Sequence, residues 1–107
     1  MDLGVYEVFD GDDFQNKISE AGSSLIVVVF YGCFAHSYKN IKSEVDKLPE
    51  EFPGVVFLKI DVELLEDLSD DYEIRLPTFT FVKDRKKIDV YEGRDIIAIK
   101  NLITKYK

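Results

Sequence analysis

Cysteine is nearly absent from this sequence: one cysteine and no tryptophan occur among 107 residues. A single cysteine cannot close a disulfide within the chain, so a disulfide framework is excluded and a reducing compartment is favoured. Long apolar runs are also missing, because no stretch approaches the roughly 18 residues that a membrane span needs. The start, residues 1–4, is acidic, which does not fit a secretory signal. We therefore expect a cytoplasmic protein without a membrane span.

Basic charge is scarce as well, since 14 Lys and Arg face 21 Asp and Glu, for a formal net charge of −7. This charge repels phosphate backbones and anionic membranes, so we expect no nucleic acid and no membrane as partner. The densest basic run is Lys83, Arg85, Lys86 and Lys87. Such a run is typical of a solvated turn, which we favour, although it would also suit an acidic partner.

The remaining composition is that of one small globular domain. Apolar residues make up 46% of the chain and aromatic residues 13%, which is enough for one modest core. No internal repeat, linker or low-complexity segment interrupts residues 1–107. We therefore expect a single domain over the whole sequence.

Helical spacing of apolar residues occurs in four segments with polar residues between them. The predicted helices run from Asp10 or Asp12 to Gly22, from about 34 to 50, between Leu64 and Tyr72, and from 96 to 106. Asp10 or Asp12 can accept hydrogen bonds from the first amides of its helix, and Gly22 suits a helix end. We expect Pro49 and Pro53 to end the second helix.

Strand patterns separate these helices, at residues 4–8, 25–31, 55–62, 78–82 and 88–91. The run at 25–31 is apolar and β-branched throughout, which predicts a strand that is buried on both faces at the centre of a sheet. The next run follows after a helical crossover and should lie parallel to it. The polar turn at 83–86 is short, so the last two strands should form an antiparallel hairpin.

This order of elements resembles the thioredoxin fold. Residues 27–32 resemble the central strand of the thioredoxin family, 39–42 the stretch after its active site, and 57–62 its third strand. Pro77-Thr78-Phe79 resembles its cis-proline turn and Gly93 its late glycine. The match extends from about residue 4 to residue 105. It implies an α/β domain with a mixed sheet of about five strands flanked by four helices, and a cis bond before Pro77.

The resemblance also places the family's Trp-Cys-Gly-Pro-Cys segment on Phe34, Ala35, His36, Ser37 and Tyr38. Ala35 and Tyr38 then occupy the two cysteine positions, and neither side chain can attack or release a disulfide. Val29 occupies the position of the family's buried acid. The resemblance therefore implies a redox-inactive protein that is not an enzyme.

The family's peptide-binding surface implies a binding role in place of catalysis. In this numbering the surface comprises Phe34, Ala35, His36, Ser37, Tyr38, Leu76, Pro77, Thr78 and Gly93. We expect a protein partner or an extended peptide segment there, and a monomer or weak homodimer. The segment Arg75-Leu76-Pro77 is one residue shorter than the family's usual approach to this proline, which would alter the shape of the groove.

Other interpretations of single residues stay open. Cys33, two residues before the nucleophile position, would serve a single-thiol oxidoreductase or redox sensor, although it also fits a small half-buried apolar residue. Cys33 and His36 have a metal-ligand spacing, yet a closed site needs about four ligands, which only two chains together would supply. We therefore expect no metal and no cofactor. Lys59, amid apolar neighbours, is expected to form a salt bridge. A structural subunit of a larger assembly is a third possibility.

Overall fold

Five strands form one mixed sheet in the order β1-β3-β2-β4-β5. The structure is a computed structural model that describes residues 5–31, 41–61 and 77–107. The strands are β1 (Tyr6–Glu7), β2 (Ile26–Tyr31), β3 (Val56–Asp61), β4 (Thr78–Lys83) and β5 (Lys86–Glu92). The β3 strand runs parallel to both β1 and β2, whereas β4 lies antiparallel to β2 and β5. These pairings confirm the predicted crossover and the predicted hairpin.

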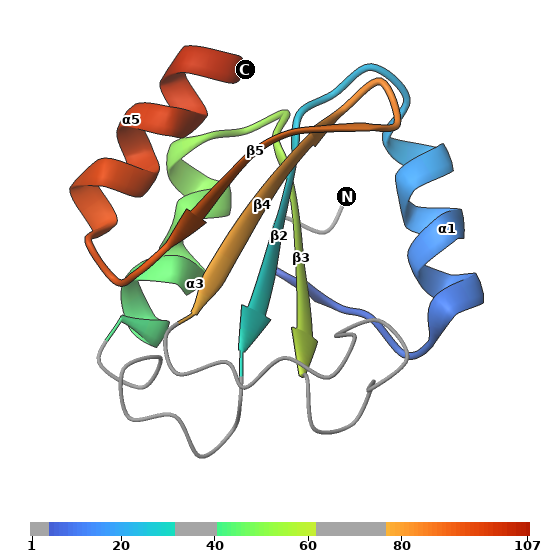
Figure 1. The fold of residues 1–107 in the computed structure, drawn as a ribbon, viewed down its shortest axis with the longest axis horizontal. Coiled ribbons are helices and arrows are strands. Elements are labelled where there is room, and N and C mark those ends of the chain that lie inside the picture. The colour runs from blue at the N-terminus through green and yellow to red at the C-terminus, as the bar shows by residue number, and fades with distance from the viewer. Residues whose placement is uncertain (1–4, 32–40, 62–76) are drawn as a thin grey trace.

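Helices cover both faces of this sheet (Figure 1). Helix α1 (Gly11–Ala21) lies on one face, and helices α3 (Lys42–Glu51) and α5 (Ile96–Tyr106) lie on the other. The described residues thus contain three of the four predicted helices. The helix predicted between Leu64 and Tyr72, and the first part of the one predicted over 34–50, lie outside the described residues.

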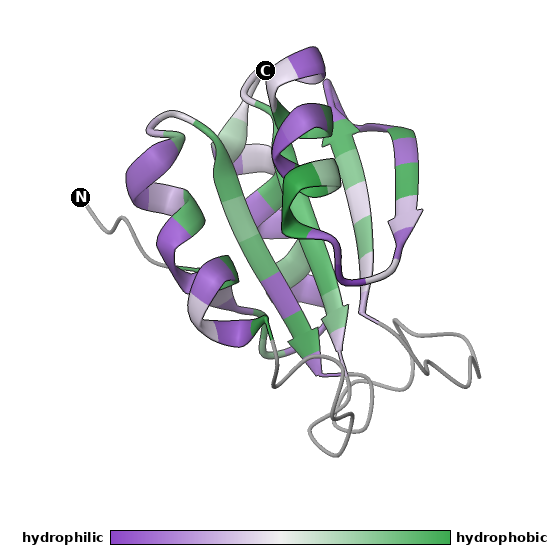
Figure 2. Ribbon diagram, turned by 90° about the vertical axis from the view of Figure 1, so that its left-hand side faces the viewer, coloured by the Kyte–Doolittle hydropathy of each residue, from purple (hydrophilic) through white to green (hydrophobic). Residues whose placement is uncertain are grey.

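Burial explains why β2 occupies the centre. Val27, Val28 and Val29 have no exposed surface, and their β-branched side chains suit a pleated strand that is covered on both sides. Val27 and Val29 belong to the core beneath α3 and α5, whereas Val28 belongs to the core beneath α1. Figure 2 shows the consequence, with mainly hydrophobic colours along the central strands and mixed colours around the helices.

Helix α3 ends between the two prolines that were predicted to end it. The predicted end was about residue 50, and α3 extends to Glu51 with Pro49 inside its last turn. A proline has no amide hydrogen, so only the hydrogen bond to the Val45 carbonyl is lost there. The next turn still closes, because the Phe52 amide donates to the Leu48 carbonyl at 2.9 Å. Pro49 is buried, so packing offsets the missing hydrogen bond.

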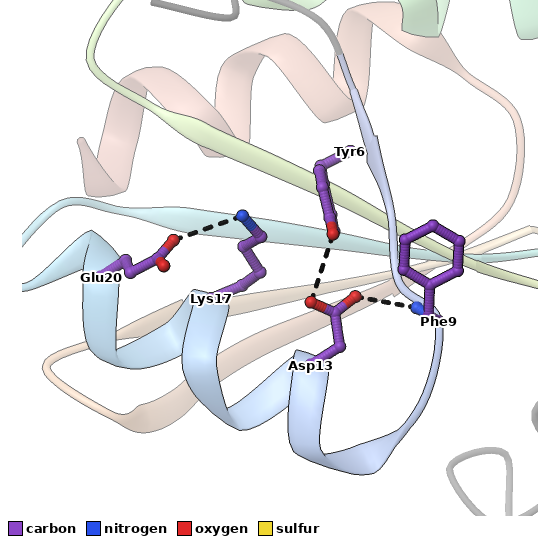
Figure 3. A network of polar contacts seen from close by, with 5 residues as sticks. All are labelled: Tyr6, Phe9, Asp13, Lys17 and Glu20. Atoms are coloured by element: carbon purple, nitrogen blue, oxygen red, sulfur yellow. Dashed lines mark hydrogen bonds and ion pairs between the residues drawn. The ribbon is translucent and has the colours of Figure 1, made fainter.

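The start of α1 is held by two aspartates, and Figure 3 shows the contacts of one of them, Asp13. The Asp10 carboxylate accepts from the Asp13 amide at 2.8 Å, which confirms the predicted cap. Asp13 reaches back and accepts from the Phe9 amide at 2.9 Å and from the Tyr6 hydroxyl at 3.2 Å. Lys17 adds a cation–π contact, with its ammonium 4.1 Å from the centre of the Tyr6 ring. This network ties α1 to the edge strand β1.

The end of α5 is tied to the other edge strand through Asp89. The Tyr106 hydroxyl donates to Asp89 at 2.7 Å, and the Val90 amide donates to the same carboxylate at 2.8 Å. Both hydrogen bonds favour the charged form, so they lower the pKa of Asp89, with the Tyr106 bond as the largest cause. The ionised carboxylate therefore stabilises the folded state at neutral pH.

This arrangement predicts a pH-dependent effect of Tyr106→Phe. A carboxylate whose pKa is lowered on folding contributes stability above its unfolded pKa, about 4, and loses that contribution as the pH falls through the lower folded pKa. Tyr106→Phe should therefore destabilise the protein at pH 7, and its difference from the unmodified chain should shrink below about pH 4. Urea unfolding across this pH range measures the difference. In an Asp89→Asn background, the destabilisation caused by Tyr106→Phe should not vary with pH. The same pH dependence in that background would contradict the role of the Tyr106–Asp89 hydrogen bond.

Candidate functional site

Pro77, Thr78 and Gly93 come together where β4 begins and β5 ends. The Gly93 amide donates to the Pro77 carbonyl at 3.0 Å, and both residues are buried. Thr78 lies opposite Glu92 on β5 and opposite Phe30 on β2. Because Phe30 is the next-to-last residue of β2, these residues lie at the carboxyl ends of β2 and β3. The structure thus joins three of the residues predicted to bind a partner.

The other predicted site residues lie outside the described residues. They are Cys33, Phe34, Ala35, His36, Ser37, Tyr38 and Leu76. No peptide bond is cis within 5–31, 41–61 and 77–107, but the bond before Pro77 includes Leu76, so its cis form stays a prediction. In the sequence, Cys33 follows Tyr31, the last residue of β2, by two residues.

Gly93 is required by a close approach of Tyr91. Its φ of +145° is a conformation that side chains disfavour, and a Cβ there would lie 2.9 Å from the Tyr91 hydroxyl oxygen. That hydroxyl accepts from the Asp95 amide at 3.3 Å. Asp95 in turn caps α5, since its carboxylate accepts from the Ile97 amide at 3.0 Å. The glycine therefore lets one tyrosine fix the start of α5 beside the site.

Gly93→Ala should destabilise the fold by about 1–3 kcal/mol, because it combines backbone strain with displacement of Tyr91. Tyr91→Phe alone should cost about 1 kcal/mol, the value of one hydrogen bond. Denaturant unfolding of both single variants and the double variant measures the coupling. The double variant should lose less than the two single losses together, because removing the hydroxyl makes room for the methyl group. Strict additivity would contradict this account of Gly93.

Val29 lies where the resemblance would place an acid. It has no exposed surface, and its neighbours across the sheet are Lys59 on β3 and Phe79 on β4. A valine can neither accept nor donate a proton. The described structure therefore provides no proton-handling group on β2 at this position.

Polar groups instead gather at the ends of the parallel strands. The Tyr31 hydroxyl donates to the Glu7 carboxylate at 2.5 Å. Glu7 is on β1, so the Tyr31 side chain spans the intervening strand β3. Asp61, directly opposite Tyr31, is only 6% exposed. Lys59 forms no ion pair with any described carboxylate, so the predicted salt bridge is absent from this part of the chain.

Four polar residues near this site were not predicted from the sequence: Glu7, Tyr31, Asp61 and Tyr91. Tyr31 and Asp61 each carry a polar group at the end of a mainly apolar strand. Because parallel strands end at the same sheet edge, the sequence indicates that these two residues lie close together. The Tyr31–Glu7 bond joins residues that are 24 apart in sequence and carries no such local signal.

Neither a metal cluster nor a membrane helix is found in the described ranges. No three His, Cys, Asp or Glu side chains there could hold a metal ion together. Cys33 and His36 lie outside these ranges. Among the same residues, no helix has the length and apolar character needed to cross a membrane.

Sheet order and helix placement define this chain as an α/β protein with a thioredoxin fold. The family model described as Thioredoxin matches residues 5–105. Thioredoxin of Ophiophagus hannah is 34% identical over 100 residues, which cover 92% of this chain and 95% of that protein. Thioredoxin of Equus caballus is 36% identical over 90 residues, which cover 83% and 86%. The solved structure of Fasciola hepatica thioredoxin matches with a TM-score of 0.90 at 32% identity, covering 96% of this chain and 100% of that one. The chain belongs to the thioredoxin family.

Proposed function

We propose that this chain is a redox-inactive member of the thioredoxin family that binds an extended segment of a protein partner. The binding surface surrounds the position of the family's active site and proline turn. It comprises Phe34, Ala35, His36, Ser37, Tyr38, Leu76, Pro77, Thr78 and Gly93. We place the protein in the cytoplasm, as a monomer or weak homodimer without metal or cofactor.

One observation carries the proposal: the chain contains a single cysteine. Dithiol exchange needs one thiolate to attack a disulfide and a second thiol to resolve the mixed disulfide. By the family register, Ala35 and Tyr38 stand at these two positions. The relatives are named thioredoxins and share the family with this chain, so the difference concerns the chemistry and not the fold.

Val29 supports the same conclusion independently. It is completely buried beside Lys59, so the position of the family's acid has become part of the apolar core. An acid at this place would be costly to bury without a partner, and a redox-inactive domain gains stability from replacing it. The two thiol positions and the acid position thus depart from the family's chemistry together.

The described part of the binding surface supports recognition of a peptide. Pro77 and Gly93 are buried and joined by a backbone hydrogen bond, which holds the start of β4 to the end of β5. Ile97, in the first turn of α5 after Gly93, is 67% exposed, and its amide is held by the Asp95 cap. An exposed apolar side chain on a backbone that is held by a helix cap is a favourable contact for a partner, because little backbone entropy is lost on binding.

Thr78→Arg should weaken partner binding at least tenfold, about 1.4 kcal/mol, because it places a long charged side chain at the start of β4 beside Gly93. Quantitative affinity capture from the source cells measures this loss against the unmodified chain. Thr80→Arg is the matched control, since Thr80 has similar burial two residues further along the same strand. It should retain the partner.

Cys33→Ser belongs in the same experiment because it separates binding from thiol chemistry. We expect Cys33→Ser to capture the same protein in the same amount as the unmodified chain. If Cys33→Ser lost the partner, and a reductant released it from the unmodified chain, then Cys33 would be a reactive thiol. The function would then be that of a single-thiol oxidoreductase or redox sensor.

A further inference from the structure

Six basic residues from two distant segments meet at one end of the molecule. The β4–β5 hairpin supplies Lys83, Arg85, Lys86 and Lys87, and the last turn of α5 supplies Lys105. Lys107 follows the helix directly, and its ammonium lies 5.5 Å from the centre of the Phe52 ring. The Lys83 ammonium donates to the Tyr106 carbonyl at 3.0 Å. The rings of Phe81 and Tyr106 add a contact with centroids 6.1 Å apart. We call these six residues the basic end; the sequence alone shows only its hairpin half.

The charge of the basic end is opposite to that of the rest of the chain. It holds six of the 14 basic residues, with only Asp84 and Asp89 among them, and leaves eight basic residues against 19 acidic ones elsewhere. The Asp89 carboxylate is occupied by Tyr106 and Val90. Within the described part of the chain, the exposed Arg85, Lys86 and Lys87 form no ion pair. The basic end therefore carries a local excess of positive charge on a chain whose net charge is negative.

The hairpin turn provides a second, independent observation. Asp84 and Arg85 both have positive φ, at 52° and 65°, as in a type I′ turn. This turn strongly favours glycine at its second central position, because a side chain is strained there. An arginine at this position lowers stability and gains nothing within the described fold, since its guanidinium has no partner there. A strained backbone conformation that no contact within the described fold explains is typical of a functional residue.

The basic end is remote from the candidate partner surface. Val82 at the hairpin lies opposite Ile26 at the amino end of β2, whereas Thr78 lies opposite Phe30 near the carboxyl end. Figure 1 shows the hairpin turn and the end of α5 at the top of the view, away from the end of β5. A ligand at the basic end would therefore leave Pro77 and Gly93 free.

From these observations we propose that the basic end binds an acidic segment of a second protein partner. The adjoining side chains of Ile88 and Val90 are 38% and 42% exposed, and they offer apolar contacts that a peptide can use. A nucleic acid or an anionic membrane would extend beyond the basic end and meet the acidic remainder of the chain. A short peptide segment needs only the local charge and the two apolar side chains.

The probe is a short fluorescein-labelled peptide of alternating glutamate and leucine, with binding followed by anisotropy at low salt. The combined Arg85→Gln, Lys86→Gln and Lys87→Gln variant should bind it at least about tenfold more weakly. The control combines Lys42→Gln, Lys47→Gln and Lys100→Gln on α3 and α5, which removes the same net charge elsewhere. This control variant should bind the peptide within about twofold of the unmodified chain. Added salt should weaken peptide binding by the control variant and by the unmodified chain.

Arg85→Gly gives an independent readout. It should raise the midpoint of thermal unfolding, because glycine relieves the strain at φ 65°, and should weaken peptide binding about threefold through the lost cation. Equal losses in both triple variants, or no binding of the peptide at low salt, would overturn the proposal. Tighter binding of a single-stranded oligonucleotide or of phosphatidylserine vesicles than of the peptide would overturn it in favour of that ligand.

Discussion

Burial of β2 on both faces is the constraint on which the rest of the structure depends. This strand pairs in parallel with β3 and antiparallel with β4, so it joins the crossover half of the sheet to the hairpin half. Burying a valine side chain contributes about 1.5–3 kcal/mol, and Val27, Val28 and Val29 are all fully buried. With valine at position 29, the strand is buried at the centre of the sheet without an acid at this position.

The same strand separates the two surfaces that we propose for binding. Its carboxyl end faces Thr78, with Pro77 and Gly93 beside it, and its amino end faces the hairpin. Tyr31 and Glu7 tie the first end to the edge strand β1, while Lys83 and Tyr106 tie the second end to α5. The two surfaces that we propose for binding therefore lie at opposite ends of one sheet.

Local patterns predicted much of this fold. The apolar run at 25–31 predicted a central strand because only a doubly buried strand tolerates such a sequence, and β2 covers Ile26–Tyr31. Asp10 and Gly22 predicted the limits of α1 because capping depends on one or two residues, and Gly22 has φ +61° at the helix end. Pro49 and Pro53 predicted the end of α3 to within about one residue, and tertiary packing retains Pro49 in the last turn of the helix.

The candidate site was less predictable, because its contacts join distant segments. Pro77 and Gly93 could be placed together only through the family resemblance, and the structure shows their hydrogen bond. The role of Tyr91 beneath Gly93 depends on a side-chain direction that no spacing rule gives. The basic end likewise needs both the hairpin and α5, which are joined through Lys83 and Tyr106.

The rate of insulin disulfide reduction tests the central claim most directly, namely that the fold has been kept while the dithiol chemistry has been lost. The unmodified chain should show no reduction above the uncatalysed rate. Ala35→Cys combined with Tyr38→Cys should restore slow reduction, because Val29 still offers no proton acceptor, and adding Val29→Asp should increase the rate. Reduction of insulin by the unmodified chain that disappears in Cys33→Ser would contradict the account, because Cys33 would then perform the chemistry that we assign as lost.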